Sequence, residues 1–182
     1  MGQYFIPVVL DTQDRITRAV DPRDYGSGDK LAGHTRADTP LMTAVETLLA
    51  LDGGARLVWA GDEHDSHPHQ PSLYHLVEPQ HFVRFAGLVD LEEAITPNAE
   101  RPIIVTTASH PYICNADKGE YIDKHRLLID DYGNRRTPLP ALTAESGWAS
   151  NRLVGSWARD RIYLSVNHPG DGWTQVPNLI WT

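Results

Sequence analysis

Apolar residues gather at the start of the chain in a pattern typical of paired β-strands. The run Tyr4–Leu10 is almost entirely apolar, which predicts a buried strand. Asp11–Asp14 is a polar segment of the kind that forms turns. Because Arg15–Val20 again has strand character, we expect the two runs to form a hairpin.

The clearest helical pattern follows. Thr39 suits the position that caps a helix, Pro40 suits the first helical turn, and Gly53 suits the residue after the last turn. The apolar residues that share one face of this helix are Leu41, Val45, Leu48 and Leu49. The next apolar segment, Arg56–Ala60, carries Trp59 and predicts a short strand.

The second half of the chain also contains strand patterns. The uninterrupted run Pro102–Thr107 is typical of a central strand. Tyr112–Cys114 and Glu120–Asp123 flank a turn and predict a second hairpin. We expect two more strands at Leu153–Trp157 and Arg161–Val166.

The middle of the chain is less definite. Leu73–Phe85 fits a strand or a helix, whereas Asp90–Ile95 predicts one short helix. Together these patterns predict the α+β class: a single compact domain over residues 1–182, with mainly antiparallel strands and two or three helices.

The two halves of the chain, residues 1–100 and 101–182, resemble each other. Thr39-Pro40-Leu41 is echoed by Thr137-Pro138-Leu139, and Arg56-Leu57-Val58 is echoed by Arg152-Leu153-Val154. A tryptophan follows each of the latter two segments. This similarity predicts two degenerate repeats of about 100 residues, each with a strand that carries a tryptophan. Chance similarity between short segments is the alternative.

Composition and charge narrow the functional classes. The chain is 41% hydrophobic and 22% charged, which is typical of a soluble chain that folds alone. The formal net charge of −8 argues against a nucleic-acid backbone or an anionic membrane as the main partner.

The single cysteine, Cys114, cannot form an internal disulfide. No apolar run approaches the ~20 residues of a membrane span. We therefore expect a cytoplasmic protein.

The richest cluster of ligating side chains lies in residues 62–69. Asp62, His64, His67 and His69 are residue types that hold Zn²⁺ or another divalent ion. The segment is, however, very polar, contains a proline and matches no established ligand spacing. A solvated loop without metal is therefore the alternative interpretation.

The two tryptophans at matching positions suggest a second candidate site. Trp59 and Trp157 each precede an aspartate by three residues. One interpretation places both indoles in the core, between the two halves. The other places them beside a groove for a small polar ligand, whose rim comprises Asp62, Arg159, Asp160 and Arg161.

Several motifs along the chain carry a resemblance to a known family. They include Met1-Gly2-Gln3-Tyr4, Val58-Trp59-Ala60-Gly61-Asp62 and Leu153-Val154-Gly155-Ser156-Trp157-Ala158-Arg159-Asp160-Arg161. With these motifs the chain resembles a family of short uncharacterised proteins from actinobacteria and their phages. The resemblance implies no activity and supplies no catalytic residues. The chain departs from the family pattern after Thr143-Ala144-Glu145, where Ser146-Gly147-Trp148 stands in place of a glycine-rich run.

No acid–base, nucleophile or cofactor motif in the sequence is complete. We therefore expect a non-enzymatic binding or interaction protein without a cofactor, acting as an accessory factor of phage or host. One alternative is a metal-dependent hydrolase that uses Asp62, His64, His67 and His69. Another is a binder of a small, nucleotide-like ligand in a groove between the two halves.

Overall fold

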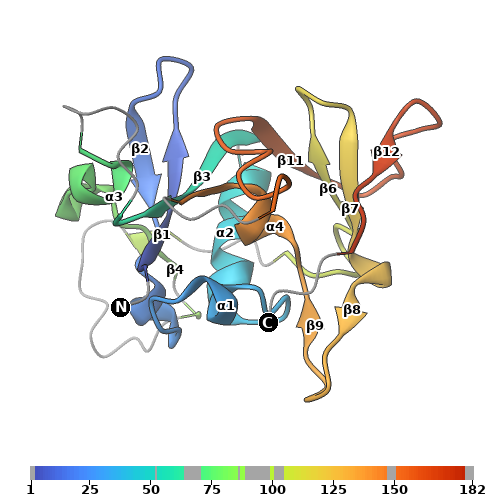
Figure 1. Ribbon diagram of the computed structural model, residues 1–182, viewed down its shortest axis with the longest axis horizontal. Helices are drawn as coiled ribbons and strands as arrows, with labels where there is room; N and C mark the ends of the chain where they lie inside the picture. Colours follow the sequence, from blue (N-terminus) through green and yellow to red (C-terminus); the bar gives the residue numbers. More distant parts are fainter. Residues whose placement is uncertain are drawn as a thin grey trace.

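The computed structural model describes residues 3–51, 53–63, 71–85, 87–88, 99–100, 105–146 and 151–178. In these residues the chain folds as a single α+β domain around a mixed sheet (Figure 1). Eight strands of the described chain form this sheet in the order β12-β7-β6-β11-β3-β1-β2, with β10 paired to β3. Most pairs are antiparallel, while β10–β3 and β12–β7 are parallel. This confirms the predicted fold class.

The strands of the main sheet are β1 Phe5–Leu10, β2 Ile16–Ala19, β3 Ala55–Gly61, β6 Tyr112–Asn115, β7 Glu120–Asp123, β10 Ala144–Glu145, β11 Arg161–Ser165 and β12 Thr174–Gln175. Two smaller pairs are β4 Arg84–Phe85 with β5 Ala99–Glu100, and β8 Leu128–Ile129 with β9 Arg135–Arg136. The helices are α1 Leu31–His34, α2 Pro40–Leu51, α3 Leu73–Leu76 and α4 Leu139–Leu142. The 3-10 helices of the described residues are η1 Pro22–Tyr25, η2 Pro79–His81 and η3 Lys124–Arg126.

Strand β1 is buried on both faces, which explains its nearly continuous apolar sequence. Phe5 and Val9 point into the main core, which also contains the apolar side chains of α2. Ile6 and Val8 point to the other side, into a second cluster that includes Leu73 of α3. The sheet is therefore covered by helices on both of its faces at β1 and β3.

Helix α2 begins and ends where the sequence predicts. The Thr39 hydroxyl accepts a hydrogen bond from the Met42 backbone N–H at 3.3 Å, so Thr39 caps the helix. Gly53 adopts a φ of 67° two residues after the last helical residue, a conformation that glycine adopts without strain. The two predicted hairpins are also confirmed, as β1–β2 and β6–β7.

His34, at the end of α1, is fully buried against β3. Its Nδ1 accepts a hydrogen bond from the Trp59 indole N–H at 2.9 Å. Since an indole nitrogen only donates, Nδ1 carries no proton and Nε2 carries one. Nε2 then donates to the Gly28 carbonyl oxygen at 2.6 Å. The ring is thus held as a neutral imidazole that joins α1 to the sheet.

One predicted strand, Leu153–Trp157, is wrong, and a second, Pro102–Thr107, is not found in the part of it that the structure describes. Residues 153–157 form a series of turns. Gly155 has a φ of 72°, which is not a strand conformation, and its N–H donates to the carbonyl of Ala141 in α4 instead of to a neighbouring strand. Residues 105–107 form no strand either, while 102–104 lie outside the described residues. Here Thr106 and Ser109 exchange side-chain-to-backbone hydrogen bonds of 2.9 and 3.1 Å, which favour a turn over a strand ladder.

The predicted repeats receive no support from the described residues. Residues 56–59 lie in strand β3, whereas their counterparts in 152–157 form turns. The segment that begins with Thr39 enters a helix of 12 residues, while the one that begins with Thr137 leads into a helix of four. The predicted helix Asp90–Ile95 lies outside the described residues, and Leu73–Phe85 contains α3, η2 and β4.

Candidate functional site

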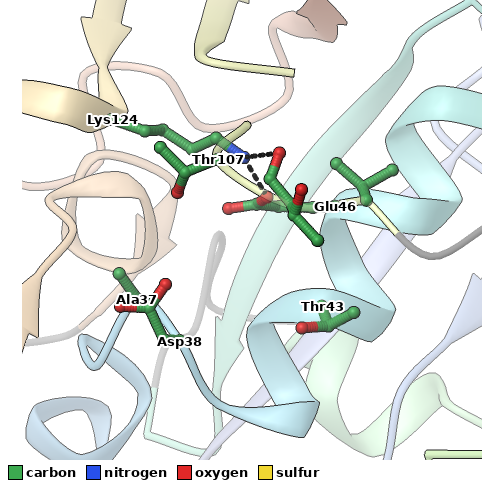
Figure 2. Close-up of a pocket in the computed structure, with 8 residues that line it drawn as sticks. Ala37, Asp38, Thr43, Glu46, Thr107 and Lys124 are labelled. Carbon is green, nitrogen blue, oxygen red and sulfur yellow. Dashed lines mark hydrogen bonds and ion pairs between the residues drawn. The ribbon is translucent and has the colours of Figure 1, made fainter. Parts of the chain in front are cut away.

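A pocket of about 190 Å³ opens beside the N-terminal half of α2 (Figure 2). Three regions distant in sequence form its walls: the loop before α2 with the helix itself, the turn at 105–107, and the first residue of η3. We call it the α2 pocket. Its lining residues are Ala37, Asp38, Thr43, Glu46, Val105, Thr106, Thr107 and Lys124.

A buried ion pair forms one side of the α2 pocket. Lys124 Nζ lies 2.6 Å from Glu46 Oε2, and the two side chains are only 3% and 6% exposed. Nζ also donates to the Thr106 carbonyl oxygen at 3.4 Å. Figure 2 shows both contacts as dashed lines above the part of the pocket that Asp38 and Thr43 border.

The fold places these two side chains for identifiable reasons. Glu46 lies on a helix that is buried on most sides, so its carboxylate meets the protein instead of solvent. Lys124 directly follows β7, where its backbone N–H donates to the Pro111 carbonyl at 2.8 Å. The Asp123 carboxylate accepts a hydrogen bond from the His125 backbone N–H at 2.9 Å and caps η3. The lysine therefore leaves a fixed turn and points at α2.

Arg135 forms hydrogen bonds to three of the segments that line the α2 pocket. One of its terminal nitrogens donates to the Asp38 carboxylate at 3.2 Å and to the Thr107 hydroxyl at 3.4 Å. The other donates to the backbone carbonyl of Lys124. A single guanidinium from β9 thus joins the loop before α2, the turn at 105–107 and η3.

Burial and charge together set the protonation of Glu46. Removal from water raises the pKa of its carboxyl above the ordinary value. The Lys124 ammonium lowers this pKa and so opposes the effect of burial, whereas the Asp38 carboxylate adds to it. Among the groups that line the pocket, two carboxylates thus face one ammonium.

Two polar atoms on α2 remain available to a ligand. Glu46 Oε1 and Thr43 Oγ1 accept no hydrogen bond from the part of the chain that the structure describes. The two residues are three apart, so they lie on the same face of the helix. Glu46 is 5% exposed overall, and both residues line the pocket. Together they present oxygen atoms to any molecule that enters.

The six residues predicted to bind a ligand do not gather at one place. Trp59 and Trp157 are both fully buried in the main core. Their indole N–H groups donate to His34 Nδ1 at 2.9 Å and to Glu120 Oε2 at 2.6 Å, respectively. Neither indole borders the α2 pocket. The two tryptophans thus lie in the core, as the first of the two sequence-based interpretations predicts, and not beside a groove.

The predicted rim residues lie at opposite ends of β3. Asp62 follows the strand, where its carboxylate accepts a hydrogen bond from the Tyr4 backbone N–H at 2.9 Å. Asp160 lies beside the other end, because Arg161 pairs with Arg56 there, and its carboxylate accepts a hydrogen bond from Asn115 at 2.8 Å. The neighbours of Asp160 are also engaged: Arg159 contacts Glu145, and Arg161 donates to the Gly53 carbonyl. A ligand at these residues stays a prediction.

The predicted metal ligands are only partly described. Asp62 is placed at the end of β3, whereas His64, His67 and His69 lie outside the described residues. Within the described part of the chain, no group of three or more His, Cys, Asp or Glu side chains is arranged to hold a metal ion. The metal site of residues 62–69 therefore stays a prediction.

Sequence reasoning missed the α2 pocket, although one signal pointed to it. Glu46 lies four residues after Met42 and three before Leu49, so helical spacing places a carboxylate among buried apolar residues. A buried carboxylate needs a partner, and this requirement predicts a cation nearby. No pattern identifies Lys124 as that cation, because the pair joins residues 78 positions apart.

Comparison with known proteins yields no match to a family model, a curated protein or a solved structure. Within the residues that the structure describes, no helix has the length and apolar character needed to cross a membrane. Any functional conclusion must therefore rest on the α2 pocket itself.

Proposed function

We propose that this chain is a non-enzymatic binding protein that takes a small polar ligand into the α2 pocket. The observation that carries the proposal is the buried Glu46–Lys124 pair, which borders a cavity and leaves one carboxylate oxygen open to it. Burying two charges costs free energy that apolar residues would not cost, so such a pair is weak evidence for stability alone. Its place beside a pocket favours a role in binding.

The size of the pocket limits the ligand. A volume of about 190 Å³ is below the 300–1,000 Å³ of typical sites for drug-sized molecules. The pocket therefore suits a ligand smaller than a drug-sized molecule. A nucleotide is larger than this, so the nucleotide-like ligand that the sequence offers as an alternative does not fit within the pocket.

The lining chemistry favours binding over catalysis. The described lining residues include neither a thiol nor an imidazole, and Lys124 is held by Glu46. Cys114 lies elsewhere, in β6, where burial raises the pKa of its thiol to about 11 and keeps it protonated at neutral pH. An accessory role in phage or host remains our proposal from the sequence motifs alone.

A thermal-shift screen tests the proposal. The wild-type protein is heated with a panel of small polar molecules at millimolar concentration, because a ligand that binds only the folded state raises the melting temperature. The variant Thr43→Val keeps the side-chain shape but removes a hydroxyl that lines the pocket. The matched control is Thr12→Val, at an exposed position in the β1–β2 turn.

We expect at least one compound to stabilise the wild type and Thr12→Val, and to stabilise Thr43→Val less. If no compound stabilises the wild type, the proposal is wrong. Equal stabilisation of all three proteins would place the binding elsewhere and would also refute it.

A further inference from the structure

The α2 pocket offers more hydrogen-bond acceptors than donors. Glu46 Oε1 and Thr43 Oγ1 accept no hydrogen bond from the described residues, and the Asp38 carboxylate, on a side chain that is 60% exposed, keeps acceptor capacity beside its bonds from Arg135. Among the described lining residues the only charged donor is Lys124 Nζ, and two of its three N–H groups already meet Glu46 and the Thr106 carbonyl. A ligand that donates hydrogen bonds therefore matches the pocket better than one that accepts them.

The charges around the pocket also favour a ligand that donates hydrogen bonds. Glu46 and Asp38 both line the pocket; the Asp38 carboxylate disfavours the ionised form of Glu46, whereas Lys124 and Arg135 favour it. Lys124 compensates Glu46 from one side, and Arg135 compensates Asp38 from outside the lining. A positive group placed between the two carboxylates would reduce the repulsion that remains, whereas an anionic ligand would increase it.

We propose that the ligand of the α2 pocket is a small primary ammonium compound. This inference rests on the binding function proposed above and names the chemical class of its ligand. A primary ammonium carries three N–H donors, one for each of the acceptor groups on Thr43, Glu46 and Asp38. Its short carbon chain would lie against Val105, a buried residue of the lining, and the side chain of Ala37.

Three probes of nearly equal size and different charge test this class. Propylammonium, propan-1-ol and propionate are each titrated into the wild-type protein at neutral pH and constant ionic strength. Ligand-observed NMR measures the dissociation constants. We expect propylammonium to bind and the other two to bind at least about tenfold more weakly, since only the cation satisfies all three acceptors.

Variants of the lining residues locate the binding. Asp38→Asn removes a charge at a largely exposed position, so it is expected to leave the fold intact and to weaken propylammonium binding by about 2- to 5-fold. Glu46→Gln is expected to weaken it more, but it also leaves Lys124 without its partner. The matched control is Asp131→Asn, at an exposed position in the β8–β9 hairpin, and it is expected to bind like the wild type.

The outcomes separate this inference from the proposed function. If propan-1-ol or propionate binds in a Thr43-dependent manner and propylammonium does not, the ammonium class is wrong and the binding function stands. If propylammonium binds Asp38→Asn and Asp131→Asn equally, its binding reflects the overall charge of −8 and the inference is overturned. If no probe and no compound of the panel binds, both proposals fail together.

Discussion

Protonation of His34 is expected to weaken the fold in mild acid. The imidazole is fully buried, and its Nδ1 faces the N–H of Trp59 at 2.9 Å. A proton added to Nδ1 would meet this N–H and replace an attraction with a repulsion. Burial lowers the pKa of His34 below the ordinary value of 6.5, although the Gly28 carbonyl and the Asp29 carboxylate oppose the shift.

The sign and size of the effect follow from proton linkage. Below pH 6.5 the unfolded chain binds a proton at this residue and the folded chain does not, so the free energy of unfolding falls as the pH falls. The loss approaches about 1.4 kcal/mol per pH unit until the pKa of the folded state is reached. Between pH 7.5 and 5.5 we therefore expect His34 to contribute a loss of up to about 1.4 kcal/mol. For a chain of this length, such a loss lowers the melting temperature by about 3–6 °C.

Urea unfolding followed by tryptophan fluorescence at pH 7.5, 6.5 and 5.5 measures this loss. The comparison is His34→Asn, which cannot gain a proton and whose side-chain oxygen can still accept from Trp59. The variant is expected to be less stable at pH 7.5, because it loses the bond to the Gly28 carbonyl, but to vary less with pH. The pKa of His110 is also lowered by burial, and its contribution cancels because both proteins retain it. An equal pH dependence in the two proteins would refute the reasoning.

Three further predictions concern the ion pair, a close backbone contact and the metal site. Lys124→Met leaves the buried Glu46 unpaired and should lower the free energy of unfolding, measured in urea, by about 3–5 kcal/mol. Adding Glu46→Leu should restore most of this stability. A double variant no more stable than Lys124→Met would contradict the prediction. Gly155→Ala places a Cβ 2.6 Å from a backbone oxygen of β10, so its melting temperature should fall further than that of Gly133→Ala, where the space is open; equal losses would contradict the contact. If residues 62–69 hold zinc, metal analysis should find a near-stoichiometric ion that His67→Ala loses, and metal-free protein with an unchanged melting temperature would exclude the site.

Local patterns predicted the elements whose hydrogen bonds are local. Both hairpins and α2 were found because the turn and cap residues of each lie within a few positions of the segment that they organise. The segment 153–157 was misread because its apolar residues pack into the core from turns. Only the position of Ala141 relative to Gly155 reveals this arrangement, and no local pattern carries that information.

The candidate site was harder to predict than the fold for the same reason. The helical spacing of Glu46 indicates a buried carboxylate, but its partner is set by the turn after β7. The sequence-based candidate sites were instead built on histidines and tryptophans, because these side chains can bind metals or ligands wherever they occur. The described tryptophans Trp59 and Trp157 form part of the core, and their polar atoms are engaged there.

The guanidinium of Arg135 has a consequence for how the α2 pocket comes into existence. It connects Asp38, Thr107 and Lys124, which are contributed by both halves of the chain. Neither residues 1–100 nor residues 101–182 alone contain all of these walls, so an isolated half cannot assemble the cavity. Ligand affinity would therefore serve as a reporter of complete folding, recovered only when two separately produced halves associate in the native arrangement.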